Sequence, residues 1–360
     1  MIIPAQFDYA FSFSEGLAAV TMDGDKYGFI DKSGMLRIPI TYDDLAFSSF
    51  RDGLIPITSD GKYGYVNSQG QTAIDFRFDW AGDFSDSLAE VQLGEDYGVI
   101  DSAGNVVITP QFDSISNFSE GLAAVRVGGK YGYIDKSGNV VISPQFDGTM
   151  SFTGGMAGVQ IGKYWGFIDK SGTLAVPAQF DRVSSFSNGL ATVELNDRYG
   201  YVDESGGLVI EPQFSHATDF SDGVAGVCSL PKLGYIDTLG QVVLEPEVRG
   251  YEIGSYSGVD VAGDPMMLPY SPPTYFRDGL AQIKVGDKFG YIDETGTIVV
   301  EAQFDESSAF YEGAAAVRRD GKAGYIDRRG KLLGTLQFEG AAPISEGLGL
   351  VYLNGLAVLS

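Results

Sequence analysis

Apolar and polar positions alternate in short stretches along the chain, and the same order of stretches returns with a period of about 34 residues. The clearest copy, from Ser119 to Asp147, reads SEGLAAVRVGGKYGYIDKSGNVVISPQFD. Its three apolar runs are separated by the turn sequences Gly-Gly-Lys and Asp-Lys-Ser-Gly. Short runs with period-two alternation between glycine-containing turns predict β-strands. We therefore expect an all-β unit, a three-stranded meander with a further short strand at Gln-Phe-Asp.

Two markers keep the same phase along the chain. The first is an aromatic-Gly-aromatic-Ile-Asp element, whose glycines are evenly spaced from Gly64 to Gly234 and then show one longer step, to Gly290. The second is the F-x-E/D-G-L element, which occurs ten times, at Gly16, Gly53, Ser87, Gly121, Gly155, Gly189, Gly223, Gly279, Gly313 and Gly347. Residues 1–360 are therefore predicted to form one array of ten repeats, the first and last incomplete.

A unit of this length is too small to bury its apolar faces alone, so neighbouring repeats must stack on one another. The recurring isoleucines are predicted to form the core between repeats, at Ile30, Ile100, Ile134, Ile168, Ile236, Ile292 and Ile326. An open superhelical or solenoid array is favoured, because ten blades of so short a repeat would be unusual for a propeller. A closed propeller-like ring is the alternative, since the partial repeats at Met1–Asp8 and Ser345–Ser360 together make one unit.

The repeated G-K-Y-G-Y-I-D-K-S-G-N-V-V-I-x-P-Q-F-D, preceded by F-S-E-G-L-A-A-V, resembles the bacterial WG-repeat family, also called KWG repeats. The resemblance covers the chain from Ala5 to Ser360. The tryptophan that gives the family its name is present only at Trp165, before Gly166, and other repeats have Tyr, Phe, Leu or Ala there. The resemblance implies a bacterial β-repeat protein used for interaction, and it brings no catalytic residues.

The charge of the chain limits its partners. Lys and Arg number 24 against 48 Asp and Glu, a formal net charge of −24. Such a surface repels phosphate backbones and anionic lipid headgroups, so we expect neither nucleic-acid binding nor membrane insertion. No signal sequence or apolar stretch of membrane-spanning length is apparent, which predicts a cytoplasmic protein if the chain is complete, or a cell-surface protein if a leader was removed. The sequence sets no oligomeric state.

Signatures of catalysis and metal binding are missing from the sequence. One histidine, His216, and one cysteine, Cys228, leave no Ser-His-Asp set and no Cys-x-x-Cys motif. The aspartate of each Tyr-Ile-Asp element, such as Asp135, is expected to cap the following turn rather than to bind calcium. We therefore predict a protein that is not an enzyme and uses no cofactor or metal.

Two features are candidate binding surfaces. The recurring aromatic residues, including Tyr133 and Tyr201, would form a ladder able to stack on sugar rings if it were exposed. The longer step between repeats inserts additional residues between Val248 and Tyr275. This inserted loop, residues 248–275, is apolar and suits a protein partner. Its candidate contact residues are Tyr251, Tyr256, Met266, Met267 and Tyr270.

The most consistent interpretation is a non-enzymatic protein-interaction scaffold that presents an extended acidic, tyrosine-rich β surface. The alternative is a carbohydrate or cell-wall binding module that uses the aromatic ladder. Solvent exposure of the ladder separates the two hypotheses, because a buried ring has no free face for a sugar.

Overall fold

The computed structural model describes residues 3–45, 49–229, 232–244, 251–252, 276–285, 287–353 and 356–359. Within these residues the chain has thirty-nine β-strands and no helix. The strands form ten small antiparallel sheets, nine of four strands and one of three. The predicted all-β array of small repeated meanders is therefore confirmed.

The chain divides into two compact units, and the first contains residues Met1–Phe152 and Phe338–Ser360. The strands of unit 1 are β1 (Ile3–Phe7), β2 (Tyr9–Ala10), β3 (Leu17–Thr21), β4 (Tyr27–Asp31), β5 (Leu36–Tyr42), β6 (Asp44–Leu45), β7 (Leu54–Ser59), β8 (Lys62–Asn67), β9 (Thr72–Phe78), β10 (Trp80–Ala81), β11 (Leu88–Leu93), β12 (Asp96–Asp101), β13 (Val106–Phe112), β14 (Ser114–Ile115), β15 (Leu122–Val127), β16 (Lys130–Asp135), β17 (Val140–Phe146), β18 (Gly148–Thr149), β37 (Gly340–Ser345), β38 (Leu348–Leu353) and β39 (Leu356–Leu359).

Unit 2 contains residues Thr153–Gln337. Its strands are β19 (Met156–Ile161), β20 (Tyr164–Asp169), β21 (Leu174–Phe180), β22 (Arg182–Val183), β23 (Leu190–Leu195), β24 (Arg198–Asp203), β25 (Leu208–Phe214), β26 (His216–Ala217), β27 (Val224–Ser229), β28 (Lys232–Asp237), β29 (Val242–Leu244), β30 (Tyr251–Glu252), β31 (Leu280–Val285), β32 (Lys288–Asp293), β33 (Ile298–Phe304), β34 (Glu306–Ser307), β35 (Ala314–Arg319) and β36 (Lys322–Asp327). The continuity of residues 1–360 as a single array stays a prediction.

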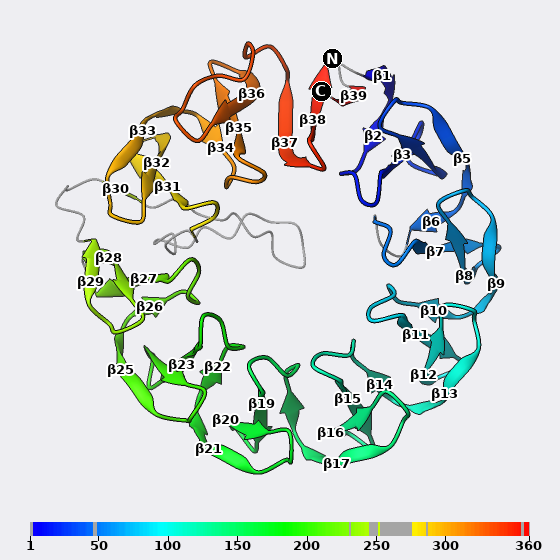
Figure 1. Cartoon of the computed structure of the whole chain (residues 1–360), viewed down its shortest axis with the longest axis vertical. Helices are drawn as coiled ribbons and strands as arrows, with labels where there is room; N and C mark the ends of the chain where they lie inside the picture. Colours follow the sequence, from blue (N-terminus) through cyan, green and yellow to red (C-terminus); the bar gives the residue numbers. More distant parts are fainter. Residues whose placement is uncertain are drawn as a thin grey trace. The chain divides into compact units, whose positions relative to one another are not determined.

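Each sheet is a meander with one short strand added, as β14-β15-β16-β17 shows. The expected short strand is present, but its place differs from the prediction. Gln111 and Phe112 end the seven-residue strand β13, the chain turns at Asp113, and the two-residue strand β14 then begins the next sheet. Figure 1 shows that within each unit these seven-residue strands follow the convex side.

The glycine after the aromatic residue allows two strands to approach closely. At Gly98 in β12, an added Cβ would lie 2.5 Å from the carbonyl oxygen of Ile108 and 2.7 Å from the nitrogen of Pro110, both in β13. Atoms this close would clash, so the strand register shifts around this point and the position requires glycine. This close approach of the two strands explains why glycine follows the aromatic residue in each copy of the element.

The F-x-E/D-G-L element is a tight hairpin turn. In the copy at residues 119–122, Ser119 and Leu122 exchange backbone hydrogen bonds of 2.8 and 3.1 Å. The two residues between them, Glu120 and Gly121, have φ values of 52° and 86°. Two consecutive left-handed residues define a type I′ turn, which matches the twist of the strands it joins.

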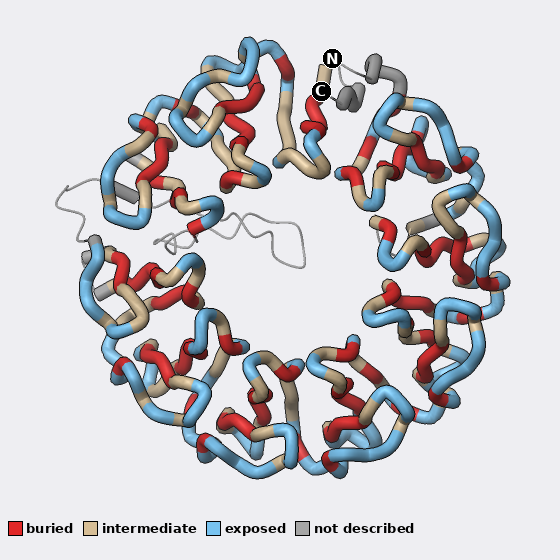
Figure 2. Tube along the Cα trace, in the orientation of Figure 1, coloured by how far each residue is buried: buried red, intermediate tan, exposed pale blue. Residues whose placement is uncertain are grey.

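The hydrophobic core lies between successive sheets, and the central strands bury both faces. In β24, Tyr201 packs with Ile236 of the following sheet, whereas Val202 packs with Phe167 of the preceding one. All seven isoleucines predicted for this core are at most 3 % exposed. Figure 2 shows the buried residues on the inner strands and the exposed ones on the seven-residue strands. The prediction of an inter-repeat core is confirmed.

The two ends of the chain share one sheet, in the order β1-β39-β38-β37. The last repeat also contacts the first as neighbours contact elsewhere in unit 1. The hydroxyl of Ser345 donates to the Phe13 carbonyl over 2.7 Å, as Ser119 does to Phe152 over 2.6 Å. The two partial repeats thus complete one four-stranded sheet of unit 1.

An ion pair also joins neighbouring sheets at the turns after four of the seven-residue strands, β5, β9, β17 and β33. The Asp79 carboxylate accepts a hydrogen bond from Lys62 of the preceding sheet over 2.5 Å and from the Gly94 N–H of the next sheet over 2.8 Å. These hydrogen bonds, chiefly the one from Lys62, hold the pKa of Asp79 below its ordinary value. Because the pair is exposed, it fixes geometry more than it stabilises the fold.

Candidate functional site

The aromatic ladder is buried, which corrects the proposal that it stacks on sugars. Tyr133 and Tyr201 are 1 % and 0 % exposed. Their hydroxyls donate to the carbonyls of Met150 and Thr218 over 2.7 and 2.8 Å. The Tyr133 ring also meets the ring of Phe152 at a centroid distance of 4.9 Å. These rings have no free face, so they are packing residues between neighbouring repeats and not ligand contacts.

The aspartates of the Tyr-Ile-Asp elements cap their turns, as the sequence predicts. One carboxylate oxygen of Asp135 accepts the backbone N–H groups of Ser137 and Asn139, both over 2.9 Å. The other accepts from the Asn139 side-chain amide. These hydrogen bonds, that of the amide first, hold the pKa of Asp135 below its usual range. Both carboxylate oxygens thus accept hydrogen bonds within the turn that follows Asp135.

The lone histidine and cysteine are neighbours on one sheet. His216 lies in β26 rather than in a loop, directly opposite Cys228 in β27. Burial lowers the pKa of the imidazole, and its ring meets that of Tyr199 at 5.6 Å. Within the residues that the structure describes, no three His, Cys, Asp or Glu side chains are placed to hold a metal ion. In the same residues no helix has the length and apolar character needed to cross a membrane.

The candidate contacts of the inserted loop fall largely beyond the described residues. Tyr256, Met266, Met267 and Tyr270 lie outside them. The backbone of Tyr251 lies in β30, opposite Val285. The role of the loop in binding stays a prediction.

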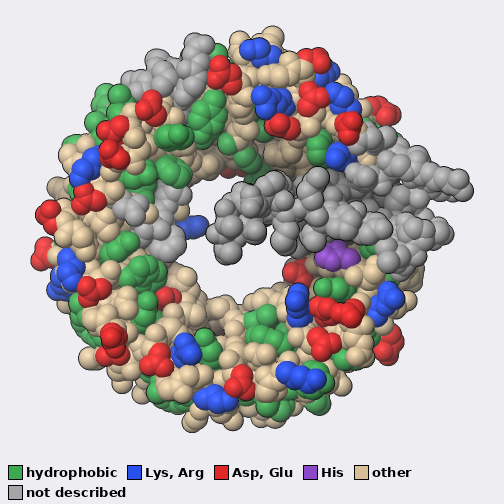
Figure 3. Space-filling model, turned by 180° about the vertical axis from the view of Figure 1, so that it is seen from behind, with side chains coloured by type: hydrophobic (Ala, Val, Ile, Leu, Met, Phe, Trp, Pro, Cys, Tyr) green, Lys and Arg blue, Asp and Glu red, His purple; other side chains and the backbone are tan. Residues whose placement is uncertain are grey.

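The seven-residue strands carry exposed aliphatic residues in successive repeats. In unit 1, Val106 and Val107 of β13 are 49 % and 39 % exposed, and Val140 and Val141 of β17 are 55 % and 43 % exposed. Each of these strands lies at the edge of its sheet and carries no charged residue. Figure 3 shows hydrophobic side chains interspersed with scattered charges over one face of the molecule. Exposed apolar surface of this kind is typical of interaction sites.

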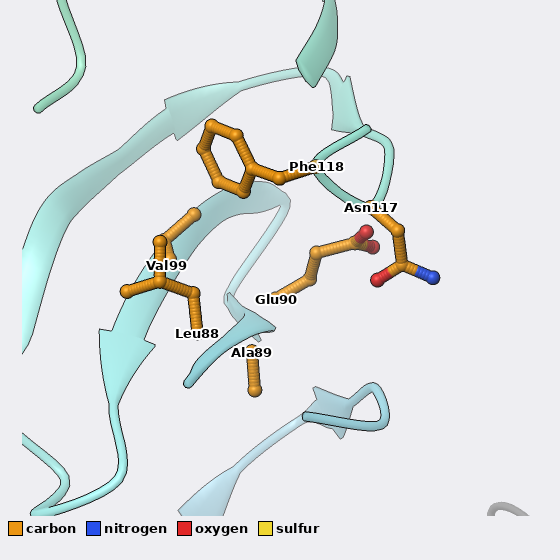
Figure 4. A pocket seen from close by; sticks show the side chains of 6 residues that line it. All are labelled: Leu88, Ala89, Glu90, Val99, Asn117 and Phe118. Carbon is orange, nitrogen blue, oxygen red and sulfur yellow. The ribbon is translucent and has the colours of Figure 1, made fainter. Parts of the chain in front are cut away.

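One interface between repeats departs from the pattern of the others. In β12 the place of the ladder aromatic is taken by Val99, and opposite it in β11 stands Glu90. Leu88, Ala89, Glu90, Val99, Asn117 and Phe118 line a shallow depression there (Figure 4), which is too small to enclose a water molecule. Valine is shorter than the tyrosine or phenylalanine found at this position in most other repeats.

The position of Glu90 holds no other acid in the ten repeats. The other repeats place Ala19, Pro56, Ala124, Gly158, Thr192, Gly226, Gln282, Ala316 and Leu350 there. Burial raises the pKa of the Glu90 carboxyl from 4.5 to about 7 because an ionised carboxylate loses hydration there. Figure 4 shows its side chain beside that of Asn117, which comes from the next sheet.

Where other repeats have a polar residue at this position, the next repeat supplies its partner. The Thr192 hydroxyl donates to the Asp219 carboxylate over 2.7 Å, and the Gln282 amide donates to the Ser307 carbonyl over 2.7 Å. Asp83, in the connection between β10 and β11, has one buried carboxylate oxygen without a hydrogen-bond partner in the described part of the chain. Burial also raises the pKa of Asp83, and the Arg51 guanidinium partly offsets that rise. This part of unit 1 therefore holds acceptors in excess of donors.

Sequence reasoning missed this site, although a signal was present. Aligning the repeats by their glycines places Glu90 among small or neutral residues and Val99 among Tyr and Phe. Each substitution alone reads as ordinary variation. Their coincidence on two paired strands is visible only once the strand register is known.

Several solved protein structures are similar in fold to this chain. The structure titled "Crystal structure of the eukaryotic initiation factor" matches with a TM-score of 0.51 at 12% identity, covering 99% of this chain and 98% of that one. BamB from Moraxella catarrhalis matches with a TM-score of 0.39 at 8% identity, covering 89% of this chain and 96% of that one. The WD40 beta propeller domain of Doa1 matches with a TM-score of 0.30 at 12% identity, covering 68% and 90%. At these identities the first match shows similarity of fold alone.

The search of curated proteins found no match. The sequence profile described as "WG containing repeat" matches nine stretches, at residues 1–25, 27–63, 63–95, 97–131, 131–165, 165–199, 199–229, 289–322 and 324–356. The matches leave out residues 230–288, which contain the inserted loop. Because these stretches cover most of the sequence and follow the period of the sheets, the chain belongs to the WG containing repeat family.

Proposed function

We propose that the chain is a non-enzymatic scaffold that binds another protein through the exposed strands at the edges of its sheets. The observation that carries this proposal is the set of exposed valine pairs on β13 and β17. An uncharged, apolar edge strand is normally covered or blunted, since it can pair with another chain. The residues shared by all repeats are used for packing, which leaves the variable edges for recognition.

The net charge of −24 favours a partner with basic groups around its apolar contact. The inserted loop, with Tyr251, Tyr256, Met266, Met267 and Tyr270, would supply a second contact to the same partner. We place the protein in the cytoplasm, or at the cell surface if a leader precedes this sequence.

The test compares two variants that carry the same added charge. Val107→Asp with Val141→Asp places carboxylates within the exposed valine pairs. The control, Ala73→Asp with Ala175→Asp, places them at the corresponding exposed positions of β9 and β21. Proteins crosslinked to each variant in the producing cell are identified by mass spectrometry, and the affinity of each captured protein is then measured by calorimetry.

The wild type and the control are expected to capture the same proteins. The valine variant should bind them at least about tenfold more weakly, because charges would be buried in an apolar contact. Equal capture and equal affinity for both variants would contradict the proposal. The loop is tested in the same way by deleting residues 248–275.

A further inference from the structure

The ninth repeat, residues 306–337, reverses the charge of the chain. Its six Lys and Arg outnumber its four Asp and Glu, which gives a net charge of +2 in a chain whose net charge is −24. Figure 3 shows Lys and Arg side chains close together at the top of the view, in the sector of β35 and β36. Arg318 donates to Glu306 over 3.2 Å, and Arg319 donates to Gln303 over 2.9 Å. The other four cations are exposed, and they are Lys322, Arg328, Arg329 and Lys331.

The same repeat lacks the seven-residue strand that most repeats have. Its sheet is β34-β35-β36, and residues 331–337 follow β36 without forming a strand. The backbone N–H of Leu333 still donates to the Tyr325 carbonyl over 2.8 Å, but its side chain is 52 % exposed. Residues 328–333, Arg-Arg-Gly-Lys-Leu-Leu, therefore present cations next to an exposed leucine. We call them the basic segment.

A cationic segment with an exposed leucine fits a protein surface that carries carboxylates beside apolar side chains. This chain has such a surface in its third repeat, residues 80–113, which contains seven acids and no Lys, Arg or His. In the hairpin between β11 and β12, Leu93 is 38 % exposed, and the exposed Glu95 and Asp96 follow it. We call residues 93–96 the acidic hairpin.

The acidic hairpin lacks the lysine that neutralises the same place in the next sheet. There, Lys130 pairs with Asp147, seventeen residues later, over 2.5 Å. Asp96 has the strand position of that lysine, and Asp113 has the position of that aspartate. The third repeat thus has two carboxylates where the fourth has an ion pair, so a cation from another molecule would restore the balance.

We propose that the basic segment of one copy of this chain docks on the acidic hairpin of a second copy. Arg329 and Lys331 would donate to the carboxylates of Glu95 and Asp96, and Leu333 would pack beside the hairpin. The contact joins unit 2 of one copy to unit 1 of the other, so a pair leaves one surface of each kind free for further copies. This association is separate from the proposed binding of another protein through the exposed valine pairs.

The charges within the contact outweigh the overall charge of the chain. At about 0.15 M salt the Debye length is about 8 Å, so acids far from the contact are largely screened. The charges that meet in the contact are opposite in sign, and they set which surfaces associate. Because the pairs are exposed, higher salt should weaken the association.

The test is sedimentation equilibrium at about 0.15 M salt over a range of protein concentrations. We expect the average mass of the wild type to rise with concentration above the 38.5 kDa of one chain. Arg329→Ser with Lys331→Asn gives the turn the residues of the fourth repeat and should weaken association at least about tenfold. The control, Lys163→Ser with Arg198→Asn, removes two exposed cations elsewhere in unit 2 and should leave association unchanged.

Reversed charges identify the second surface. Arg329→Glu with Lys331→Glu should abolish association, and so should Glu95→Lys with Asp96→Lys, because like charges then meet. Mixed in equal amounts, the two variants should associate again, since every contact between them joins opposite charges. This recovery shows that both variants are folded.

Three results would overturn the inference. They are a wild type that stays a monomer up to about 1 mM, association that Arg329→Ser with Lys331→Asn leaves intact, and a mixture of the two reversed variants that does not associate. The capture of other proteins through Val107 and Val141 is measured with different variants, so it can hold or fail independently of these results.

Discussion

Tyr133 and Val99 stand at the same position of consecutive repeats in unit 1. The two interfaces differ because only Tyr133 supplies an aromatic ring and a hydroxyl. At Tyr133 the ring packs on Phe152 and the hydroxyl donates to Met150. At Val99 there is no ring or hydroxyl, and Phe118 lines a shallow depression beside the valine. In a repeat array whose shared residues hold neighbours together, loss of the aromatic ring removes a packing contact and a hydrogen bond from one interface.

The opposing strand shows the same difference. Ala124 faces Tyr133 and leaves room for the ring, whereas Glu90 faces Val99. A partly buried acid without a partner carries a desolvation cost that the alanine of the next repeat does not. The effects of substitutions at the Val99 interface can therefore be compared with those at the Tyr133 interface of the same chain.

The largest expected effect on stability is that of removing the buried Tyr133 ring. Tyr133→Ala should lower the local free energy of unfolding by about 3–5 kcal/mol, because it leaves a large cavity and an unpaired Met150 carbonyl. Val99→Ala should cost only about 1–2 kcal/mol, since it removes two methyl groups and leaves no hydrogen-bonding group unpaired. Hydrogen exchange of the amides in β11 to β16 measures both, because the stability of a repeat array is local. Equal losses for the two variants would refute the contrast.

The next effect is a pH dependence confined to the Val99 interface. The folded-state pKa of Glu90 is raised to about 7, so folding favours the protonated acid. Its stabilising contribution is present below the ordinary pKa of 4.5 and is lost as the pH rises toward 7. The local loss should be on the order of 2–3 kcal/mol.

The titratable neighbours of Glu90 do not reverse this direction. Asp83 also has a raised pKa, and Tyr65 remains protonated because burial and the charges of Asp83 and Glu90 raise its pKa. Hydrogen exchange at pH 5 and pH 8 for wild type and Glu90→Ala measures the change. Retention of the full pH dependence in Glu90→Ala would assign it to another group.

Restoring the aromatic residue should stabilise the array by a smaller amount. Val99→Tyr with Glu90→Ala copies the pairing of Tyr133 with Ala124 and adds a ring and a hydroxyl that can donate to the Ser116 carbonyl, for an expected gain of about 1–3 kcal/mol at pH 8. The gain is measured as slower exchange of the amides in β12 and β15. A loss of stability would mean that the backbone at this interface has adapted to valine.

The smallest expected effect concerns the tyrosine hydroxyl alone. Tyr133→Phe should cost about 1 kcal/mol, because it removes one hydrogen bond and keeps the ring. The chain already contains this state at Phe167, which is fully buried and meets Phe186 at 5.0 Å. Exchange of the Met150 region in wild type and Tyr133→Phe gives the value. A cost of several kcal/mol would show that the ring shifts without its hydroxyl.

The repeat unit, its strands and its isoleucine core follow from the sequence because spacing and alternation determine them. The capping role of Asp135 also follows, since it depends on its own turn alone. Two features do not follow. Burial of Tyr133 depends on which face meets the next repeat, and the pairing of Glu90 with Val99 depends on the register of two strands. Both are properties of pairing between repeats, which local patterns do not encode.

The most direct measurement is an NMR titration of the Glu90 carboxyl carbon. The account predicts a midpoint near pH 7, because burial disfavours the ionised form. A midpoint near the ordinary glutamate value of 4.5 would contradict it.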